Sequence, residues 1–208
     1  MLLAEEKKQV MKNKSIIKLV VGITLISIGF GLILSSVLVN VKQHIEQDKL
    51  IVEFKEAIEA SETQEEAFTE PTLNNPAIEG DVLYNLRIPS IESENPVREG
   101  ISKGVLADSL GHEPGTAYIG EKGNCVIAGH RNYTFGKFFN RLDEVQVGDE
   151  IYVDTKTGTR KYIVKEIKVV EPEDVSVLES TDEEQLTLYT CTPIYVATHR
   201  LVIIADPV

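Results

Sequence analysis

The sequence predicts an all-β domain that is preceded by a membrane-spanning helix. The 208-residue chain carries a long uncharged apolar run over residues 19–40. From residue 82 onward, short apolar runs rich in strand-forming residues alternate with turn residues. Thr157 and Gly158 join two of these runs and are typical of a hairpin turn. Many short strands with turns at such spacing indicate a β-sandwich or a β-barrel.

The N-terminal segment predicts a retained membrane anchor. Residues 1–18 carry five lysines: Lys7, Lys8, Lys12, Lys14 and Lys18. A bilayer core needs about 20 apolar residues in a helix, and residues 19–40 supply that length. The alternative, a cleaved signal peptide, normally has an apolar segment of about 7 to 15 residues and a cleavage site of small residues. Because the lysines lie on its N-terminal side, we expect residues 1–18 in the cytoplasm and the rest of the chain outside the cell.

Residues 41–80 are expected to connect the anchor to the domain. Over residues 41–60 apolar side chains recur at roughly helical spacing among charges, which predicts that the helix continues beyond the bilayer. Residues 61–80 are rich in Glu, Asn and Pro, as in a flexible linker. A spacer and a lid over an active site are both open readings of this linker, and its composition favours the spacer.

The domain itself is expected to span residues 81–208. We predict strands over residues 82–88, 115–119, 124–128, 150–155, 160–170, 186–189 and 201–205. Short helices are expected near residues 104–110 and 137–142. Roughly 125 residues are enough to bury a closed core.

Two predicted strands near the C-terminus flank a candidate nucleophile. Cys191 follows the strand over residues 186–189, and Arg200 precedes the strand over residues 201–205. A permanent positive charge near a thiol favours the thiolate, which is the reactive form of cysteine. A lone cysteine at a strand end is more often structural, so the proposal needs a base as well.

The strand over residues 124–128 is followed by a histidine that can supply this base. Of the four histidines, His44 lies outside the domain, and His112 lies in a glycine-flanked turn where a structural hydrogen bond is expected. His199 is adjacent to Arg200, so the two side chains should point to opposite faces of the strand. His130 therefore remains as the candidate acid–base residue.

Three separated segments resemble the signature of sortases, the membrane-anchored cysteine transpeptidases of Gram-positive bacteria. They are Thr-Leu-Tyr-Thr-Cys at 187–191, Thr-His-Arg-Leu at 198–201 and Ile-Ala-Gly-His-Arg at 127–131. The likeness extends over most of residues 82–206. It implies an eight-stranded β-barrel with short helices, and it assigns catalysis to Cys191, His130 and Arg200.

These residue types suit acyl transfer through a covalent intermediate. Cys191 as a thiolate would attack a peptide carbonyl and form a thioacyl enzyme. Arg200 would stabilise the oxyanion, and His130 would protonate the leaving amine. The resemblance implies that the substrate is a secreted protein with a C-terminal sorting motif of the LPxTG or LPxTA kind. The acceptor would be an amine of the cell wall.

The finer assignments concern the substrate groove and the sortase class. Thr190, Thr192 and Ile194, which flank the cysteine, are candidate substrate-binding residues. The linker has no Asp-Pro-aromatic lid triplet, which favours a class D-like sortase over a class C pilin polymerase. A cell-wall cysteine hydrolase and an anchored domain that only binds a partner are the alternatives outside this activity.

A second cysteine, Cys125, raises the possibility of a disulfide with Cys191, since the domain is expected outside the cell. Alternation along the strand places Cys125 on the face opposite to His130. If His130 faces Cys191, Cys125 should not, and we expect Cys125 to be a small buried apolar residue.

The composition excludes several kinds of ligand. The net charge of −12 argues against nucleic acid as a partner. No cofactor is expected, and no ligand cluster has the spacing of a zinc site. The acidic stretch over residues 171–184 is read as a solvated face, with cation binding as the alternative.

Overall fold

The computed structural model describes residues 2–63, 70–131 and 138–208, with the side chains of the N-terminal helix described at residue 11 and at residues 17–58. Within these residues, the chain forms one long helix, α1 (Leu2–Thr63), and eight strands. The strands are β1 (Val82–Ile88), β2 (Ser93–Glu99), β3 (Leu110–His112), β4 (Gly123–Ala128), β5 (Glu150–Thr155), β6 (Gly158–Val170), β7 (Glu184–Thr192) and β8 (His199–Pro207).

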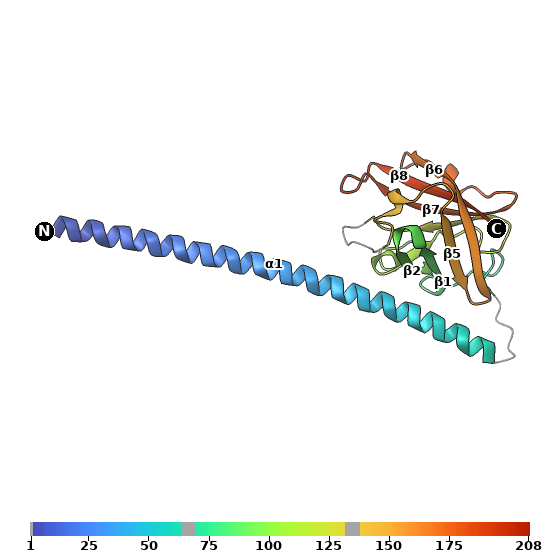
Figure 1. The fold of residues 1–208 in the computed structure, drawn as a ribbon, viewed down its shortest axis with the longest axis horizontal. Helices are drawn as coiled ribbons and strands as arrows, with labels where there is room; N and C mark the ends of the chain where they lie inside the picture. The colour runs from blue at the N-terminus through green and yellow to red at the C-terminus, as the bar shows by residue number, and fades with distance from the viewer. Residues whose placement is uncertain (1, 64–69, 132–137) are drawn as a thin grey trace. The chain divides into compact units, whose positions relative to one another are not determined.

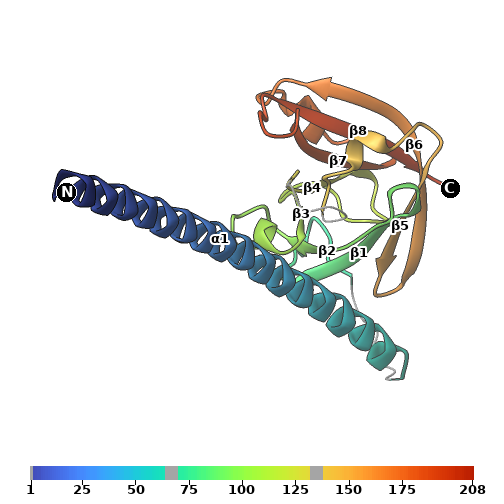
Figure 2. The ribbon, with the colours of Figure 1, turned by 60° about the vertical axis from the view of Figure 1, so that its left-hand side comes forward.

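Figure 1 shows the strands gathered into a barrel. The barrel is closed, and the strand order around it is β1-β2-β3-β4-β7-β8-β6-β5. The barrel that the resemblance implies is therefore confirmed. The pairs β2–β3 and β4–β7 are parallel, and the other neighbouring pairs are antiparallel. Because β4 and β7 are parallel, their carboxyl ends lie at the same edge of the barrel wall (Figure 2).

Alternate side chains of the strands fill the barrel interior. Ile127 of β4, Leu188 of β7 and Ile203 of β8 are completely buried in one hydrophobic core. Burying a side chain of this size contributes about 2 kcal/mol. Each strand therefore has an inner and an outer face, and a residue's parity along the strand decides which face it occupies.

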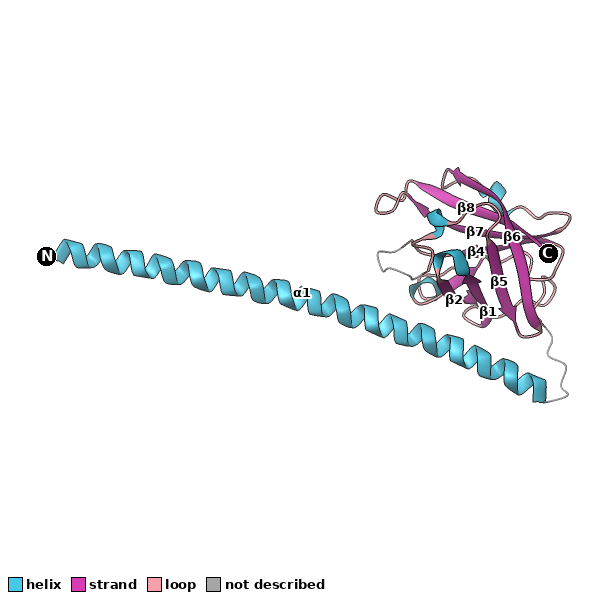
Figure 3. Cartoon of the chain, in the orientation of Figure 1, coloured by secondary structure: helices cyan, strands magenta, loops and turns pink. Residues whose placement is uncertain are grey.

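Short helical turns surround the barrel (Figure 3). They are η1 (Pro89–Ile91), η2 (Val105–Ala107), η3 (Leu142–Glu144) and η4 (Val175–Leu178). A helix expected over residues 104–110 is a single 3-10 turn, η2. Of the helix expected over residues 137–142, residue 137 lies outside the described residues, and the helical turn η3 begins only at Leu142.

One predicted strand is wrong and two strands were not predicted. Residues 115–119 form turns and irregular chain, because Gly115 and Gly120 adopt φ angles of +84° and +90°, which redirect the backbone. The strands β2 and β3 lacked a sequence signal. The predicted hairpin at Thr157 and Gly158 is confirmed, since β5 and β6 pair directly across it.

The helix α1 contains a segment, Ile17–Ile58, with a stretch long and apolar enough to cross a membrane. The chain divides into two compact units, residues 1–44 and 45–208, so the second unit contains the last turns of α1 as well as the barrel. The predicted boundaries of the anchor, residues 19–40, and of the connecting segment, residues 41–80, remain predictions.

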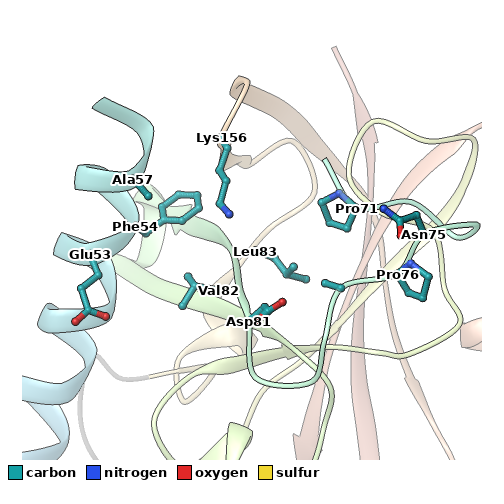
Figure 4. Close-up of a pocket in the computed structure, with 11 residues that line it drawn as sticks. Glu53, Phe54, Ala57, Pro71, Asn75, Pro76, Asp81, Val82, Leu83 and Lys156 are labelled. Carbon is teal, nitrogen blue, oxygen red and sulfur yellow. The ribbon is translucent and has the colours of Figure 1, made fainter. Parts of the chain in front are cut away.

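Within the second unit, the last turns of α1 pack on the barrel. Phe54 is 3% exposed, and Lys55 forms an ion pair of 3.3 Å with Glu94 of β2. A cavity of about 480 Å³ lies between Phe54, Val82 and Lys156 (Figure 4). No residue of β4, β7 or β8 lines this cavity, so it is separate from the candidate active site.

Candidate active site

Strand register brings the three sequence-predicted residues to one level of the barrel wall. In the parallel β4–β7 pair, Ala128 lies opposite Tyr189, and the same offset places His130 level with Cys191 two residues later. In the antiparallel β7–β8 pair, Cys191 lies directly opposite Arg200. Neighbouring strands are about 4.8 Å apart, so the three backbone positions span about 10 Å across the wall, with Cys191 in the middle.

All three side chains belong to the outer face. Ile127 and Leu188 point into the core, so residues at the opposite parity on β4 and β7 point outward. His130 is exposed, and both Cys191 and Arg200 are partly exposed. The thiol is therefore accessible to an extended peptide lying on the outside of the barrel.

The chain around His130 is held tightly against β7. The backbone N–H of Gly129 donates to the carbonyl oxygen of Tyr189 at 3.1 Å, and the buried Thr190 hydroxyl donates to the carbonyl oxygen of Gly129 at 2.7 Å. A Cβ at Gly129 would lie 2.5 Å from Phe139 and 2.6 Å from Leu110. Only glycine fits here, so the residue before His130 is fixed by close packing on both sides.

The guanidinium of Arg200 is tied to the loop between β7 and β8. Its Nη1 donates to the carbonyl oxygens of His199 at 3.1 Å and of Ala197 at 3.4 Å. The neighbouring His199 ring lies 3.3 Å from Glu171 at Nε2. The two histidines on either side of Cys191 in the sequence therefore have different surroundings. The offset of β4 and β7 aligns His130 with Cys191, whereas His199 contacts the loop between β6 and β7.

A tyrosine and a glutamate line the outer wall below the cysteine. Tyr189, on the same face of β7 as Cys191, donates its hydroxyl proton to Glu113 Oε2 at 2.7 Å. Burial, and then the hydrogen bond to Glu113, raises the pKa of Tyr189. Sequence reasoning missed Glu113, because β3, which ends at His112 just before it, was not predicted.

Two predictions about the remaining candidates are confirmed. His112 is completely buried, and its ring nitrogens lie 2.9 Å from Glu99 Oε2 and 3.1 Å from the carbonyl oxygen of Ala117, which is a structural role. It lies at the end of β3 and not in a turn. Cys125 is unbonded and lies in the core, where burial raises the pKa of its thiol.

The three candidate substrate-binding residues differ in their surroundings. Thr190 is 1% exposed, with its hydroxyl bonded to Gly129. The hydroxyl oxygen of Thr192 accepts a hydrogen bond of 2.9 Å from Arg131 Nη1. Ile194 is partly exposed in the loop after β7. Substrate binding by these residues remains a prediction, and Arg131 is a contact that sequence reasoning missed.

A thiol between an imidazole and a guanidinium on an open surface can attack an acyl carbon, deliver a proton and stabilise an oxyanion. Among the side chains that the structure describes, no three of His, Cys, Asp or Glu gather closely enough to hold a metal ion. Independently of this, a thiol flanked by these two side chains is suited to covalent catalysis by cysteine.

Comparison with known proteins agrees with this geometry. The Sortase domain family model matches residues 86–208. Sortase D of Bacillus subtilis is 33% identical over 109 residues, which cover 52% of this chain and 53% of that protein. Sortase SrtE1 of Streptomyces coelicolor is 34% identical over 134 residues, which cover 57% of this chain and 38% of that protein. The match thus spans about half or less of the length of these relatives.

Among solved structures, the chain is similar to a Clostridium perfringens Sortase D5 transpeptidase. The TM-score is 0.65 and the sequence identity 34%, over 78% of this chain and 98% of that chain. The similarity therefore covers nearly the whole of that structure.

Proposed function

Because this chain belongs to the sortase family, whose domain matches more than half of its length, we propose that it is a membrane-anchored cysteine transpeptidase. It cleaves a sorting motif of the LPxTG or LPxTA kind on a secreted protein. It then transfers that protein to an amine of the cell wall. The catalytic residues of this proposal are Cys191, His130 and Arg200.

The single observation that carries the proposal is the shared level of these residues on adjacent strands. Cys191 lies opposite Arg200 in the β7–β8 ladder. Extending the β4–β7 offset two residues beyond the last pair, Ala128 with Tyr189, aligns His130 with the other side of Cys191, which supports the assignment. Cys125, by contrast, faces inward and belongs to the hydrophobic core. The proposal thus assigns a catalytic role to one of the two cysteines and to one of the four histidines in the chain.

The proposed reaction has two halves. In the first, the Cys191 thiolate attacks the carbonyl carbon of the scissile peptide bond, Arg200 hydrogen-bonds the oxyanion, and His130 gives its proton to the leaving amine. The peptide bond breaks and a thioester forms. In the second half, the acceptor amine attacks the thioester, its proton passes to His130, and the new amide leaves the thiolate free.

The class of the enzyme is proposed as class D-like. The likeness to Sortase D and to Sortase D5 supports this, and so does the missing lid triplet in the linker. The anchor over residues 19–40 would hold the domain at the membrane. The lysines of residues 1–18 support an orientation in which the barrel faces outward.

A mass-spectrometric assay tests this function. The full chain in detergent micelles is incubated with a panel of sorting peptides and an amine that resembles the wall stem peptide. We expect a new amide between the peptide and the amine, formed by the wild type and not by the Cys191→Ala variant. A matched Cys125→Ala variant should keep the activity.

The products also separate the alternatives. A free carboxylic acid in place of the amide, with the amine present in excess, would identify a cysteine hydrolase. Peptides that stay intact across the panel, with a folded wild type, would leave an anchored binding domain and refute the transpeptidase.

A further inference from the structure

The side chain of Arg131 is buried although the preceding residue, His130, is exposed. Only 6% of the Arg131 side chain is exposed. His130 has outward parity, so Arg131 has inward parity. Burying a guanidinium is costly unless its donors are bonded, so its partners indicate what it does.

The partners of Arg131 come from two segments, the end of β7 and the stretch over residues 140–143. Nη1 donates to Thr192 Oγ1 at 2.9 Å, Nη2 lies 2.7 Å from Asp143 Oδ1, and Nε lies 3.5 Å from the carbonyl oxygen of Asn140. Thr192 directly follows Cys191, and Asp143 belongs to η3. One rigid guanidinium thus connects the residue after His130 to the residue after Cys191.

This connection lies where backbone pairing between β4 and β7 ends. Below the level of His130 and Cys191, Gly129 and Tyr189 share a backbone hydrogen bond, and Thr190 bonds the carbonyl oxygen of Gly129. Above that level, the Arg131–Thr192 hydrogen bond links the same two segments. The histidine and the cysteine are therefore clamped from both sides.

We propose that Arg131, anchored by Asp143, is a positioning residue that holds His130 and Cys191 at their working separation. The inference rests on the proposed function, because it gives Arg131 a role in that reaction. Arg131 acts through its neighbours and not on the substrate, since its donors are engaged within the protein. A fork of donors is needed to bond a hydroxyl and a carboxylate at once, and lysine lacks it.

The first test compares steady-state kinetics of the full chain in micelles. Arg131→Lys and Thr192→Val should each lower kcat about 10- to 100-fold with KM changed less than about twofold, because small misplacements of catalytic groups cost that much. The double variant should lose no more than the worse single variant. Asp143→Asn, which keeps an oxygen acceptor, should retain more kcat than Asp143→Ala.

A matched control comes from the opposite side of the barrel. Arg87 of β1 forms a two-point contact with Asp154 of β5, at 2.9 Å from both Nε and Nη2. Arg87→Lys removes an equivalent fork without touching β4 or β7, and it should keep kcat unchanged. Any of four results would overturn the proposal. Two concern the arginine variants: an equal loss of kcat in both, or a normal kcat in Arg131→Lys. The others are a rise in KM alone and additive losses in the double variant.

A second readout does not depend on turnover. The pH profile of Cys191 alkylation by iodoacetamide is measured for the wild type, Arg131→Lys, Arg87→Lys and His130→Ala. If Arg131 holds His130 beside the thiol, the Arg131→Lys profile moves toward that of His130→Ala, while Arg87→Lys matches the wild type. An Arg131→Lys profile identical to the wild type overturns the positioning role. If Cys191 of the wild type is alkylated normally but the wild type never makes product, the transpeptidase is refuted. The comparison of alkylation profiles between the variants stays valid in that case.

Discussion

At the scale of single residues, the two cysteines show how strand parity separates a partly exposed thiol from a buried one. Cys191 has outward parity on β7 and is partly exposed, whereas Cys125 has inward parity on β4 and is 2% exposed. The fold thus gives the same functional group two different environments. Apolar residues alternate along β7, whereas β4 is apolar at four consecutive positions, so the parity of Cys125 was read by counting along the strand from His130.

Alkylation at increasing pH tests this difference. Burial raises the pKa of the Cys125 thiol, so Cys125 stays protonated and unreactive well above neutral pH. We expect iodoacetamide to modify Cys191 and to spare Cys125 up to about pH 9 in the folded chain. Peptide mapping measures both sites. Modification of the two cysteines at comparable rates in the native state would contradict the structure.

The side chain of Arg200 gives a second prediction at this scale. Arg200→Lys keeps the positive charge beside Cys191 but loses the planar fork of donors. We expect kcat to fall about 100-fold, which is the scale of losing one oxyanion donor. Pre-steady-state kinetics of thioester formation measure the effect. A near-normal rate would mean that Arg200 serves the loop between β7 and β8 and not the oxyanion.

At the scale of elements, the strands with clear apolar alternation were predictable and the irregular ones were not. The predicted bounds of β1 and β5 match the structure. The strand β2 contains Pro96 and several charged residues, and β3 has only three residues, so neither carries a periodic signal. Because β3 pairs with β4, missing it also hid the Tyr189–Glu113 contact beside the site.

The candidate site was also predictable only in part. The candidate catalytic residues were nominated from residue type, strand ends and family resemblance. The register pairs Cys191 with Arg200, and the β4–β7 offset, extended two residues beyond Ala128, aligns His130 with Cys191. The supporting contacts of Arg131 and Thr190 depend on which strands are neighbours. Neighbours in a barrel are set by tertiary pairing, and β4 and β7 lie far apart in the sequence, so local patterns cannot reveal them.

The loop between β6 and β7 is held by one buried side chain, which gives a prediction for an element. Asn124 Nδ2 donates to the carbonyl oxygens of Val177 at 2.9 Å and Glu179 at 3.2 Å, and its Oδ1 accepts from Thr187 at 2.6 Å. Asn124→Ala leaves these groups without partners, and we expect a stability loss of about 2 kcal/mol. Hydrogen exchange across residues 171–183 should become faster.

Asn95 provides the matched control for this loop. It is also buried, and it bonds Ser93 and the backbone N–H of Phe138. Asn95→Ala should destabilise the barrel similarly while exchange in residues 171–183 keeps its native rate. If both variants loosen the loop equally, Asn124 only contributes to global stability.

At the scale of the whole molecule, the chain combines a helix with a membrane-length apolar segment and a closed barrel. The proposed orientation places the lysine-rich N-terminus in the cytoplasm and Cys191 outside. A membrane-impermeant maleimide applied to intact cells should therefore label Cys191 on the full chain. A Cys191→Ala chain with Lys18→Cys should be labelled only after lysis. Labelling of the Lys18→Cys chain in intact cells would reverse the proposed topology.

The parallel pairing of β4 with β7 also bears on when the proposed site is completed during synthesis of the chain. His130 and Cys191 are about 60 residues apart, so their meeting requires closure of a long loop, whereas the β5–β6 hairpin between them forms locally. A chain synthesised from its N-terminus contains His130 well before Cys191, and Arg200 is added last. We therefore expect the proposed site to be complete only when β7 and β8 take their places in the barrel wall.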